Sequence, residues 1–314
     1  MAPKQALICG SLAFDTIMVF EDRFKNHILA DKVHMLSVAF YVPTLRREFG
    51  GCAGNISYNL KLLGGHPVPF GSVGRDFDSY RAHFEALEID LRCVRELPDH
   101  YTAQAYITTD LDDNQITAFH PGAMTQSHGA HVKDVRNVAF GIVAPDNRDA
   151  MLQHAAEFRE MGVPFIFDPG QALPLFNGEE FRAFIENATY VSVNDYESQL
   201  LSERTGWSPE QIAEKVSAYI VTRGAEGSRW YTREGLIEIP SAKAKAVLDP
   251  TGCGDAYRAG LIYGLMNGLE FETTGRIASL MGAIKIEHPG TQNQKFDREQ
   301  FLTRFHHEFG YRFE

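Results

Sequence analysis

The chain has 314 residues, of which 44% are hydrophobic and 23% are charged, and its formal net charge is −11 at pH 7. This composition is typical of a soluble globular protein with a large core, and it excludes disordered and fibrous chains. The negative charge argues against nucleic acid and anionic membrane surfaces as partners, because both need positive charge on the protein.

The amino-terminal residues and the cysteines favour a cytoplasmic protein. Residues 1–15 lack the basic region and apolar run of a signal peptide. No later stretch reaches the about 18 apolar residues of a membrane helix. Cys9, Cys52, Cys93 and Cys253 stand singly. We therefore expect free thiols rather than disulfides or a zinc site.

Short apolar runs alternate with stretches of helical spacing along most of the chain. The runs predict buried strands at 6–9, 138–144, 164–168, 190–194 and 219–224. Between them, helices with Asn, Asp or Ser at plausible N-caps are predicted at 146–162, 177–188, 195–206 and 208–219, and two more helices are predicted at 255–269 and 273–288. This alternation predicts an α/β fold with a doubly wound, mostly parallel sheet flanked by helices.

Two segments, at about 14–50 and 98–122, interrupt this alternation. In the second, Thr, Tyr and Ile alternate on either side of an Asp-Asp-Asn-Gln turn at 112–115, which is a hairpin signal. No linker marks a boundary, so we expect one domain, 1–314, with these segments inserted as a small antiparallel sheet. That sheet either covers a site as a lid or only decorates an edge. The sequence also leaves open a monomer or a homodimer paired through the lid.

Polar residues near the first strand and the first helix are candidates for binding a polyhydroxylated ligand. Asp15 follows the strand at 6–9, where a carboxylate can accept hydrogen bonds from the two vicinal hydroxyls of a ribose or merely stabilise a turn. In "GGCAGNISYNLKLLG" (50–64), Asn55 either caps a helix or binds such a ligand together with the backbone of Gly51.

Two later strands also end in polar residues. In "NDYE" (194–197), Asn194 and Glu197 can cap a helix, or they can hold a hydrated Mg²⁺ through water. In "TRGAEGS" (222–228), three residues can form a hairpin turn or let the backbone approach a nucleotide, namely Thr222, Gly224 and Gly227.

The stretch "DPTGCGDAYRAG" (249–260) carries the strongest chemical signal. Gly252 and Gly254 allow successive N–H groups to enter a helix and form a concavity for an anion. Asp255 can cap that helix. It can also accept a proton from an alcohol while the concavity holds the phosphoryl group under attack.

Two neighbours of Asp255 have roles that the sequence leaves open. Cys253 is either a small residue that fills space or a nucleophile, because a helix N-terminus lowers the pKa of a thiol. Arg258, one turn further into the helix, faces either phosphate or solvent.

Taken in order, the motifs G-x-x-x-x-D, G-G-x-x-x-N, N-x-x-E, T-x-G-x-x-G and D-x-T-G-x-G-D between residues 10 and 255 resemble those of the ribokinase-like (PfkB) family of sugar and nucleoside kinases. The resemblance implies an ATP- and Mg²⁺-dependent phosphotransferase. It makes Asp255 the general base and the backbone of 252–254 the anion hole.

The same resemblance implies roles for the remaining candidates. It assigns substrate binding to Asp15, Gly51 and Asn55, and the magnesium and phosphate network to Asn194 and Glu197. Thr222, Gly224 and Gly227 fall on the ATP loop. Asp249 and Thr251 match positions near a monovalent-cation site, for K⁺, of some members.

Within the family, "GSLAFDTIM", "AFYVP" (39–43), "AFHPGAM" (118–124) and "GTQNQKF" (290–296) are similar to adenosine kinases. Phe40, Tyr41 or Phe119 can stack on a purine, a contact that a free sugar does not need. The predicted reaction is transfer of the γ-phosphoryl group of ATP to the 5′-hydroxyl of adenosine, giving AMP and ADP in purine salvage. The alternatives are a kinase for ribose or fructose, a non-catalytic nucleoside sensor, and a thiol enzyme that uses Cys253.

Overall fold

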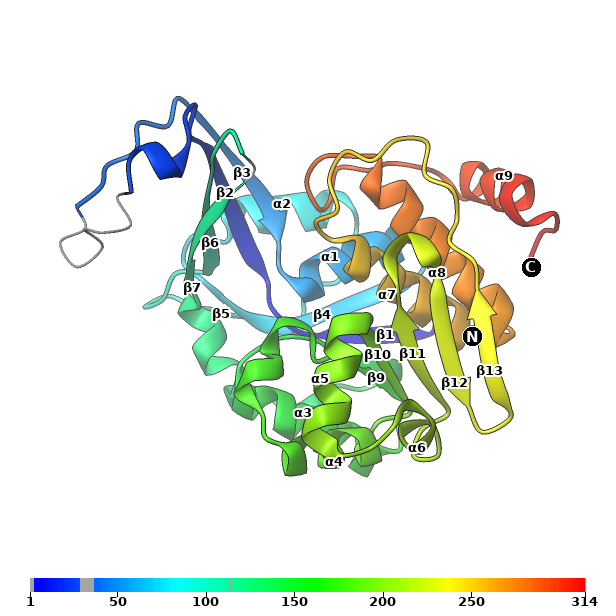
Figure 1. Ribbon diagram of the computed structural model, residues 1–314. Helices are drawn as coiled ribbons and strands as arrows, with labels where there is room; N and C mark the ends of the chain where they lie inside the picture. The colour runs from blue at the N-terminus through cyan, green and yellow to red at the C-terminus, as the bar shows by residue number, and fades with distance from the viewer. Residues whose placement is uncertain (1–2, 29–36, 113, 314) are drawn as a thin grey trace.

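The computed structural model describes residues 3–28, 37–112 and 114–313, and in this part of the chain the strands form two sheets (Figure 1). Residues 29–36 of the predicted segment 14–50, and Asp113 of the predicted turn, lie outside the described residues. The strands of the larger sheet are, in spatial order, β13 (Gly235–Ile239), β12 (Ser228–Thr232), β11 (Ala218–Thr222), β10 (Tyr190–Asn194), β9 (Phe165–Phe167), β8 (Val138–Val143), β1 (Gln5–Cys9), β4 (His66–Gly74) and β5 (Val94–Leu97).

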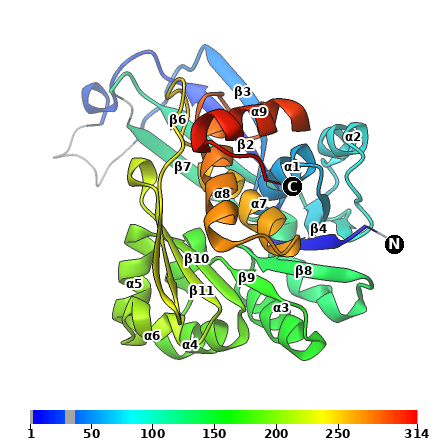
Figure 2. The same ribbon diagram turned by 90° about the vertical axis from the view of Figure 1, so that its right-hand side faces the viewer.

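Helices cover both faces of the larger sheet, as Figures 1 and 2 show. On one side lie α1 (Cys52–Leu62), α2 (Asp78–Ala86), α7 (Cys253–Met266) and α8 (Phe271–Ile286), with α9 (Arg298–Phe309) packed on α8. On the other side lie α3 (Arg148–Met161), α4 (Gly178–Asn187), α5 (Asp195–Thr205) and α6 (Pro209–Ala213). Short 3₁₀ helices occur at η1 (Phe24–Asn26), η3 (Gly122–Gly129), η4 (Val132–Asp134), η5 (Gly170–Leu175) and η6 (Gly224–Glu226).

The doubly wound, mostly parallel sheet that the sequence predicts is confirmed. The strands from β11 to β5 are parallel, and β12 and β13 add an antiparallel edge. In β1, Leu7 and Cys9 belong to the core on one face, whereas Ala6 and Ile8 belong to the core on the other. The continuous apolar run is therefore explained by burial on both faces. None of the described helices is long and apolar enough to cross a bilayer.

One predicted helix is too long, and one central strand was not predicted. The helix expected at 208–219 ends at Ala213, because residues 218–222 are needed for strand β11 beside β10. The sequence reading also missed β4, which pairs with β1 near the centre of the sheet. Pro67 and Pro69 lie inside β4, and prolines count against a strand in any sequence pattern.

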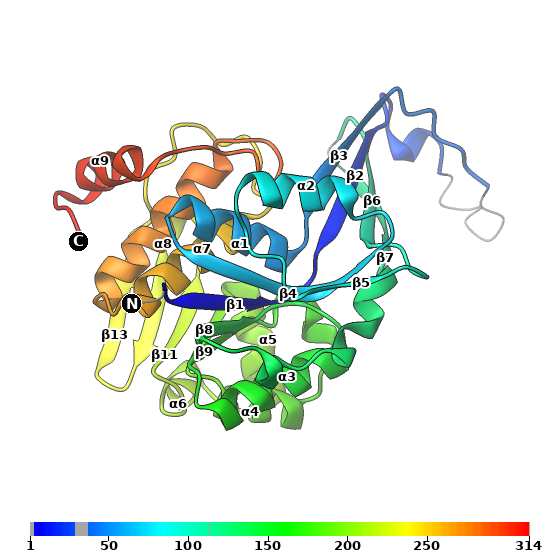
Figure 3. The same ribbon diagram turned by 180° about the vertical axis from the view of Figure 1, so that it is seen from behind.

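The second sheet is present, but it is mixed rather than antiparallel. Its strands, in order, are β3 (Thr44–Gly50), β2 (Ala13–Val19), β6 (Ala103–Thr109) and β7 (Gln115–His120). The central pair, β2 and β6, is parallel, because both strands leave the same end of the larger sheet. Figure 3 shows the second sheet rising at that end, where β1 leads into β2. Whether it moves as a lid stays a prediction.

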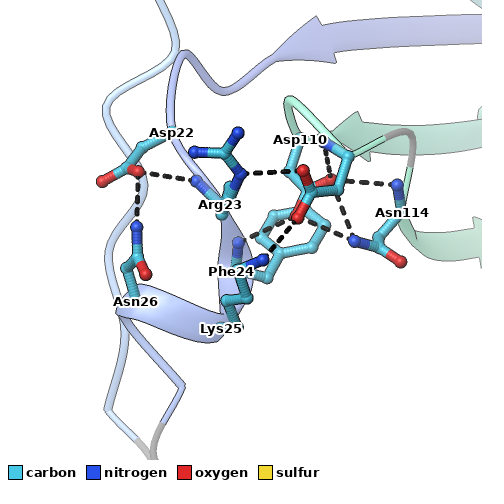
Figure 4. Close-up of polar contacts among 8 residues, drawn as sticks. Asp22, Arg23, Phe24, Lys25, Asn26, Asp110 and Asn114 are labelled. Atoms are coloured by element: carbon cyan, nitrogen blue, oxygen red, sulfur yellow. Dashed lines mark hydrogen bonds and ion pairs between the residues drawn. The ribbon is translucent and has the colours of Figure 1, made fainter.

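Asp110 connects η1 with the turn between β6 and β7 through hydrogen bonds (Figure 4). Its carboxylate accepts hydrogen bonds from the amides of Phe24, Asp112 and Asn114, each at 2.9 Å, and from Nδ2 of Asn114 at 3.1 Å. The residue is only 5% exposed. One carboxylate thus joins two segments of the second sheet that are far apart in the sequence.

Aromatic rings complete this corner of the second sheet. Phe40 packs against both Phe20 and Phe24, and its ring centroid lies 4.8 Å from that of Phe20 and 5.1 Å from that of Phe24. Of the aromatic residues predicted to stack on a purine, Phe40 is therefore engaged in packing, whereas Tyr41 is 83% exposed.

The bonds of Asp110 predict a local effect of its removal. In Asp110→Ala, the amides of Phe24 and Asn114 lose their acceptor, so their hydrogen exchange should accelerate by about tenfold or more. Asp112→Ala is the matched control, since it removes only surface ion pairs with Arg23 and Lys25. Equal acceleration in the two variants would contradict the role of Asp110.

Candidate active site

Helix α7 begins at a left-handed turn. Gly252 is the N-cap residue with φ of 79°, a conformation that glycine adopts without strain. Asp255 is the third residue of the helix, and its side chain bonds to another element instead. The prediction that Asp255 caps the helix is therefore wrong, because the chain turns into the helix at Gly252. Asp255 still lies in the first turn, where the helix dipole favours a negative charge.

The first turn of α7 presents backbone donors beside Asp255. The amide of Cys253 donates to the carbonyl of Pro250 at 3.2 Å. Within the described residues, the amides of Gly254 and Asp255 make no hydrogen bond, as expected at a helix N-terminus. The predicted concavity thus retains free donors at 254 and 255, while that of Cys253 is engaged.

Asn55 holds the carboxylate of Asp255. Its Nδ2 donates to Oδ2 of Asp255 at 2.8 Å. Asn55 is 4% exposed and lies inside α1, whose N-cap residue is Gly51, so Asn55 does not cap that helix. Burial raises the pKa of Asp255, and the bond from Asn55 and the charge of Arg258 oppose this shift. Among ionised carboxylates, one with a raised pKa is the stronger base, which suits proton acceptance.

A buried polar network that the sequence reading missed supports Asn55. Nε2 of Gln292 donates to Oδ1 of Asn55 at 3.0 Å and to Oη of Tyr80 at 2.7 Å. Tyr80 donates in turn to the carbonyl of Gly50 at 2.8 Å, and His83 lies 3.1 Å from Oε1 of Gln292. The loop between α8 and α9 thereby fixes the side-chain amide that contacts Asp255.

Arg258 is paired with a buried acidic residue and does not face solvent. It is 7% exposed, and its Nη2 donates to Oδ1 of Asp168 at 2.7 Å, while its Nε contacts the other oxygen. Asp168 follows β9 and is 2% exposed. Burial raises the pKa of Asp168 to about 7, and the charge of Arg258 opposes that rise. Nη2 of Arg258 also lies 4.0 Å from Oε2 of Glu197, so α7 is linked to the end of β9 and to the first turn of α5.

Asp15 lies inside strand β2 rather than in the exit turn after β1, because residues 13–19 pair with β3 and β6. Across the second sheet, Glu48, Asp15, Ala105 and Phe119 occupy one row and therefore share a face. Burial raises the pKa of Asp15 to about 6, and the charges of Asp255 and Glu48 add to the rise. The structure thus brings Asp15, Asn55 and Asp255 together, with Phe119 on the same face as Asp15.

The residues predicted to bind ATP lie at the ends of β10 and β11. Asn194 caps α5 in a reciprocal arrangement with Glu197, in which each accepts the other's amide proton at 2.8 Å. Thr222 pairs with Asn194 across the sheet. Gly224 is exposed, whereas a side chain at Gly227, with φ of 85°, would collide with the carbonyl of Ile239.

The magnesium role predicted for Asn194 and Glu197 stays a prediction. Within the described residues, no group of three His, Cys, Asp or Glu side chains is placed to hold a metal. Mg²⁺ keeps several of its waters and binds through few carboxylates together with substrate phosphates. The side chain of Glu197 is partly buried beside the start of α7 and can orient such waters.

The thiol hypothesis for Cys253 loses its physical basis. Burial raises the pKa of Cys253 to about 11, with Asp249 and Asp255 adding to the rise against the opposing charge of Lys285. The expected lowering by the helix N-terminus is outweighed, so the thiol is protonated at neutral pH and is a poor nucleophile. All four cysteines are free.

The oxygens of Asp249 do not fit the predicted potassium site. The carboxylate of Asp249 accepts the amides of Thr251 at 2.9 Å and Gly290 at 2.8 Å. The carbonyl of Asp249 accepts Nζ of Lys285 at 2.9 Å. The carboxylate and carbonyl oxygens of Asp249 are therefore already bound to donors of this chain, and the predicted role of Thr251 stays a prediction.

Comparison with known proteins places this geometry in a family. The sequence profile described as pfkB family carbohydrate kinase matches residues 18–297. The chain belongs to this family. Its members are phosphotransferases that act on a hydroxyl group, and the fold and enzyme class that the sequence predicts are confirmed.

Individual relatives cover almost the whole chain. A solved structure of a nucleoside kinase from Burkholderia thailandensis in complex with inosine is 52% identical, has a TM-score of 0.89, and covers 98% of this chain and 99% of that one. The structure of the same protein in complex with ADP-inosine is 54% identical, with a TM-score of 0.87, and covers 98% of this chain and 97% of that one. A nucleoside kinase from Methanocaldococcus jannaschii is 32% identical over 261 residues, 82% of this chain and 85% of that protein.

The buried pair of Arg258 and Asp168 predicts a pH-dependent stability effect. Arg258→Met leaves the Asp168 carboxylate buried without a counter-charge, which should lower the free energy of unfolding by about 3 kcal/mol or more. The loss should be larger at pH 8 than at pH 5, because Asp168 can become neutral by protonation at the lower pH. Urea unfolding at pH 5 and pH 8 measures the loss in the free energy of unfolding.

Two further variants control this measurement. The double variant Arg258→Met/Asp168→Asn should recover part of the loss, since it removes both charges. Arg229→Met breaks an exposed pair with Glu238 and should change stability little at either pH. A loss in Arg258→Met that matches Arg229→Met would contradict the prediction.

Proposed function

We propose that this chain is a nucleoside kinase that transfers the γ-phosphoryl group of ATP to the 5′-hydroxyl of a purine nucleoside, adenosine among them. The observation that carries the proposal is the position of Asp255, beside free amides of α7 and held by Asn55. The inosine complex of the 52% identical relative supports a nucleoside as the substrate class. Inosine is therefore tested beside adenosine.

In the proposed reaction, the carboxylates of Asp15 and Asp255 have different roles. Asp15 accepts hydrogen bonds from the 2′ and 3′ hydroxyls of the ribose, and Asp255 takes the proton of the 5′ oxygen as that oxygen bonds to phosphorus. The bond between the γ-phosphorus and the bridging oxygen breaks, and ADP leaves. The amides of Gly254 and Asp255 stabilise the charge on the moving group. Mg-ATP, when bound along Asn194, Glu197, Thr222, Gly224 and Gly227, supplies the phosphoryl group and charge neutralisation.

The second sheet offers an apolar surface for a base. Phe119 is 53% exposed and shares its face with Asp15. Ile17 and Ile107, two positions along the same strands as Asp15 and Ala105, lie on that face as well. An aromatic ring beside aliphatic side chains suits the flat face of a purine, whereas a free sugar presents mainly hydroxyls.

A substrate panel tests the proposal. With Mg-ATP, adenosine and inosine should be phosphorylated at much higher kcat/KM than ribose or fructose. Turnover of a free sugar without turnover of any nucleoside would favour the sugar-kinase alternative. Nucleoside binding without turnover of any compound would favour a sensor.

Asp255→Asn tests the base assignment. Loss of a general base should lower kcat by about 10²- to 10⁴-fold, while nucleoside affinity measured by calorimetry stays within a few-fold. Cys253→Ala is the control variant and should keep its activity, since the thiol is assigned no chemical role. Full activity in Asp255→Asn would end the assignment.

The raised pKa of Asp15 predicts pH-dependent nucleoside binding. Below a pH of about 6, Asp15 becomes protonated and loses its charge-assisted hydrogen bonds, so affinity should fall as the pH drops. In Asp255→Asn, one of the charges that raise the pKa of Asp15 is gone, so the fall in affinity should occur at lower pH. Calorimetric titrations between pH 5 and pH 8 measure nucleoside affinity in the unmodified protein and in Asp255→Asn. The same pH dependence in the two proteins would refute the coupling between Asp255 and Asp15.

A further inference from the structure

Lys285 is a fully buried lysine that has no acidic hydrogen-bond partner among the residues that the structure describes. It lies in α8 and is 0% exposed. Its Nζ donates to the carbonyl of Asp249 at 2.9 Å and to the carbonyl of His288 at 3.1 Å. Lysine is rarely buried completely, because removing an ammonium group from water is costly unless its surroundings compensate. The position of Lys285 therefore calls for a physical reason.

The surroundings of Lys285 are those of a cation site. Carbonyl oxygens can replace the hydration shell of a monovalent cation such as K⁺. Here two carbonyl oxygens hold the ammonium, and the negative charge of Asp249 lies near enough to favour its charged form. Burial lowers the pKa of Lys285, and the negative charge of Asp249 opposes this shift without cancelling it.

The oxygens that Lys285 binds belong to the segment that leads into α7. The amides of Leu248 and Asp249 donate to the carbonyl of Ile286 at 2.9 and 3.2 Å. The Asp249 carboxylate then bridges the amides of Thr251 and Gly290. Residues 248–251 are thus bound to the end of α8, directly before the turn at Gly252 where the free amides begin.

We propose that the ammonium of Lys285 acts as a built-in monovalent cation, which positions the turn before α7 and makes this kinase independent of added potassium. Lys285 is a positioning residue, because it touches the 249–251 segment and not the reacting atoms. The inference rests on the role proposed above for the amides of Gly254 and Asp255.

The first test uses the unmodified protein. At constant ionic strength, kcat and the KM for ATP should be the same within twofold in the chloride salts of potassium, sodium and choline, a change of under about 0.4 kcal/mol in barrier height. Activation by K⁺ of about tenfold over sodium and choline would overturn the proposal, since it would show that a separate cation is needed.

The second test removes the ammonium. Lys285→Met should lower kcat/KM for ATP in sodium chloride by about tenfold, less than the about hundredfold cost of losing one direct donor to the transition state. K⁺ or NH₄⁺ should restore most of the activity, and Na⁺ and Li⁺ should not. Lys243→Met, at an exposed lysine in the loop before Asp249, is the matched control and should behave as the unmodified protein in every salt. Lost activity that no cation restores would mean that Lys285 is only structural, and the proposal fails.

A third measurement is independent of catalysis. In the absence of nucleoside and ATP, the melting temperature of Lys285→Met should be higher in potassium chloride than in sodium chloride, because K⁺ binds the folded state. The unmodified protein and Lys243→Met should melt at the same temperature in both salts. This readout stays valid if the nucleoside assignment is wrong. If Lys285→Met does not fold in either salt, the salt series on the unmodified protein still decides the proposal.

Discussion

The position of the first turn of helix α7 is the constraint on which the site depends. Three elements hold it through side chains that are distant in the sequence. Asn55 of α1 bonds to Asp255 across 200 residues, and Asp168 after β9 bonds to Arg258 across 90. Lys285 of α8 holds the preceding segment. Because a displacement of about 1 Å at a reacting group can cost a hundredfold in rate, these contacts bear directly on the chemistry.

In each of these contacts, a charged group is removed from water and a neighbouring group of the protein compensates its charge. Arg258 is matched by Asp168, the ammonium of Lys285 by carbonyl oxygens and the charge of Asp249, and the carboxylate of Asp255 by the amide of Asn55. Such groups add little net stability relative to an apolar core, because desolvation offsets the attraction. They do disfavour alternative arrangements, since any shift leaves a buried charge without its partner. In this protein, the network defines one geometry for Asp255.

The sequence predicts the parts of this molecule that local patterns encode. The strand ending at Cys9 is apolar on both faces, the strand ending at Asn194 buries Val191 and Val193 on one face, and the caps at Asn147, Asn177 and Ser208 bond as their residue types favour. The cap predicted at Asp255 was wrong because the left-handed turn at Gly252, and not residue preference, decides where α7 begins. Asp168, Gln292 and Lys285 were missed because their partners lie on other elements. The motif identifies residues that are close to Asp255 in the sequence. The residues that hold Asp255 in position are brought to it by tertiary packing.

The two carboxylates of the site come from different layers, and this links ligand binding to the arrangement of the sheets. Asp15 belongs to the second sheet and Asp255 to the body beneath it, and the charge of Asp255 helps to raise the pKa of Asp15. In the proposed reaction, the ribose hydroxyls donate to Asp15 while the 5′-hydroxyl donates to Asp255. One ligand thus offsets the repulsion between the two carboxylates. A ligand shifts an equilibrium by its differential affinity for the two states. A nucleoside that satisfies both carboxylates therefore favours the arrangement in which they face each other, and the same contacts that recognise the substrate hold the reacting oxygen beside Asp255.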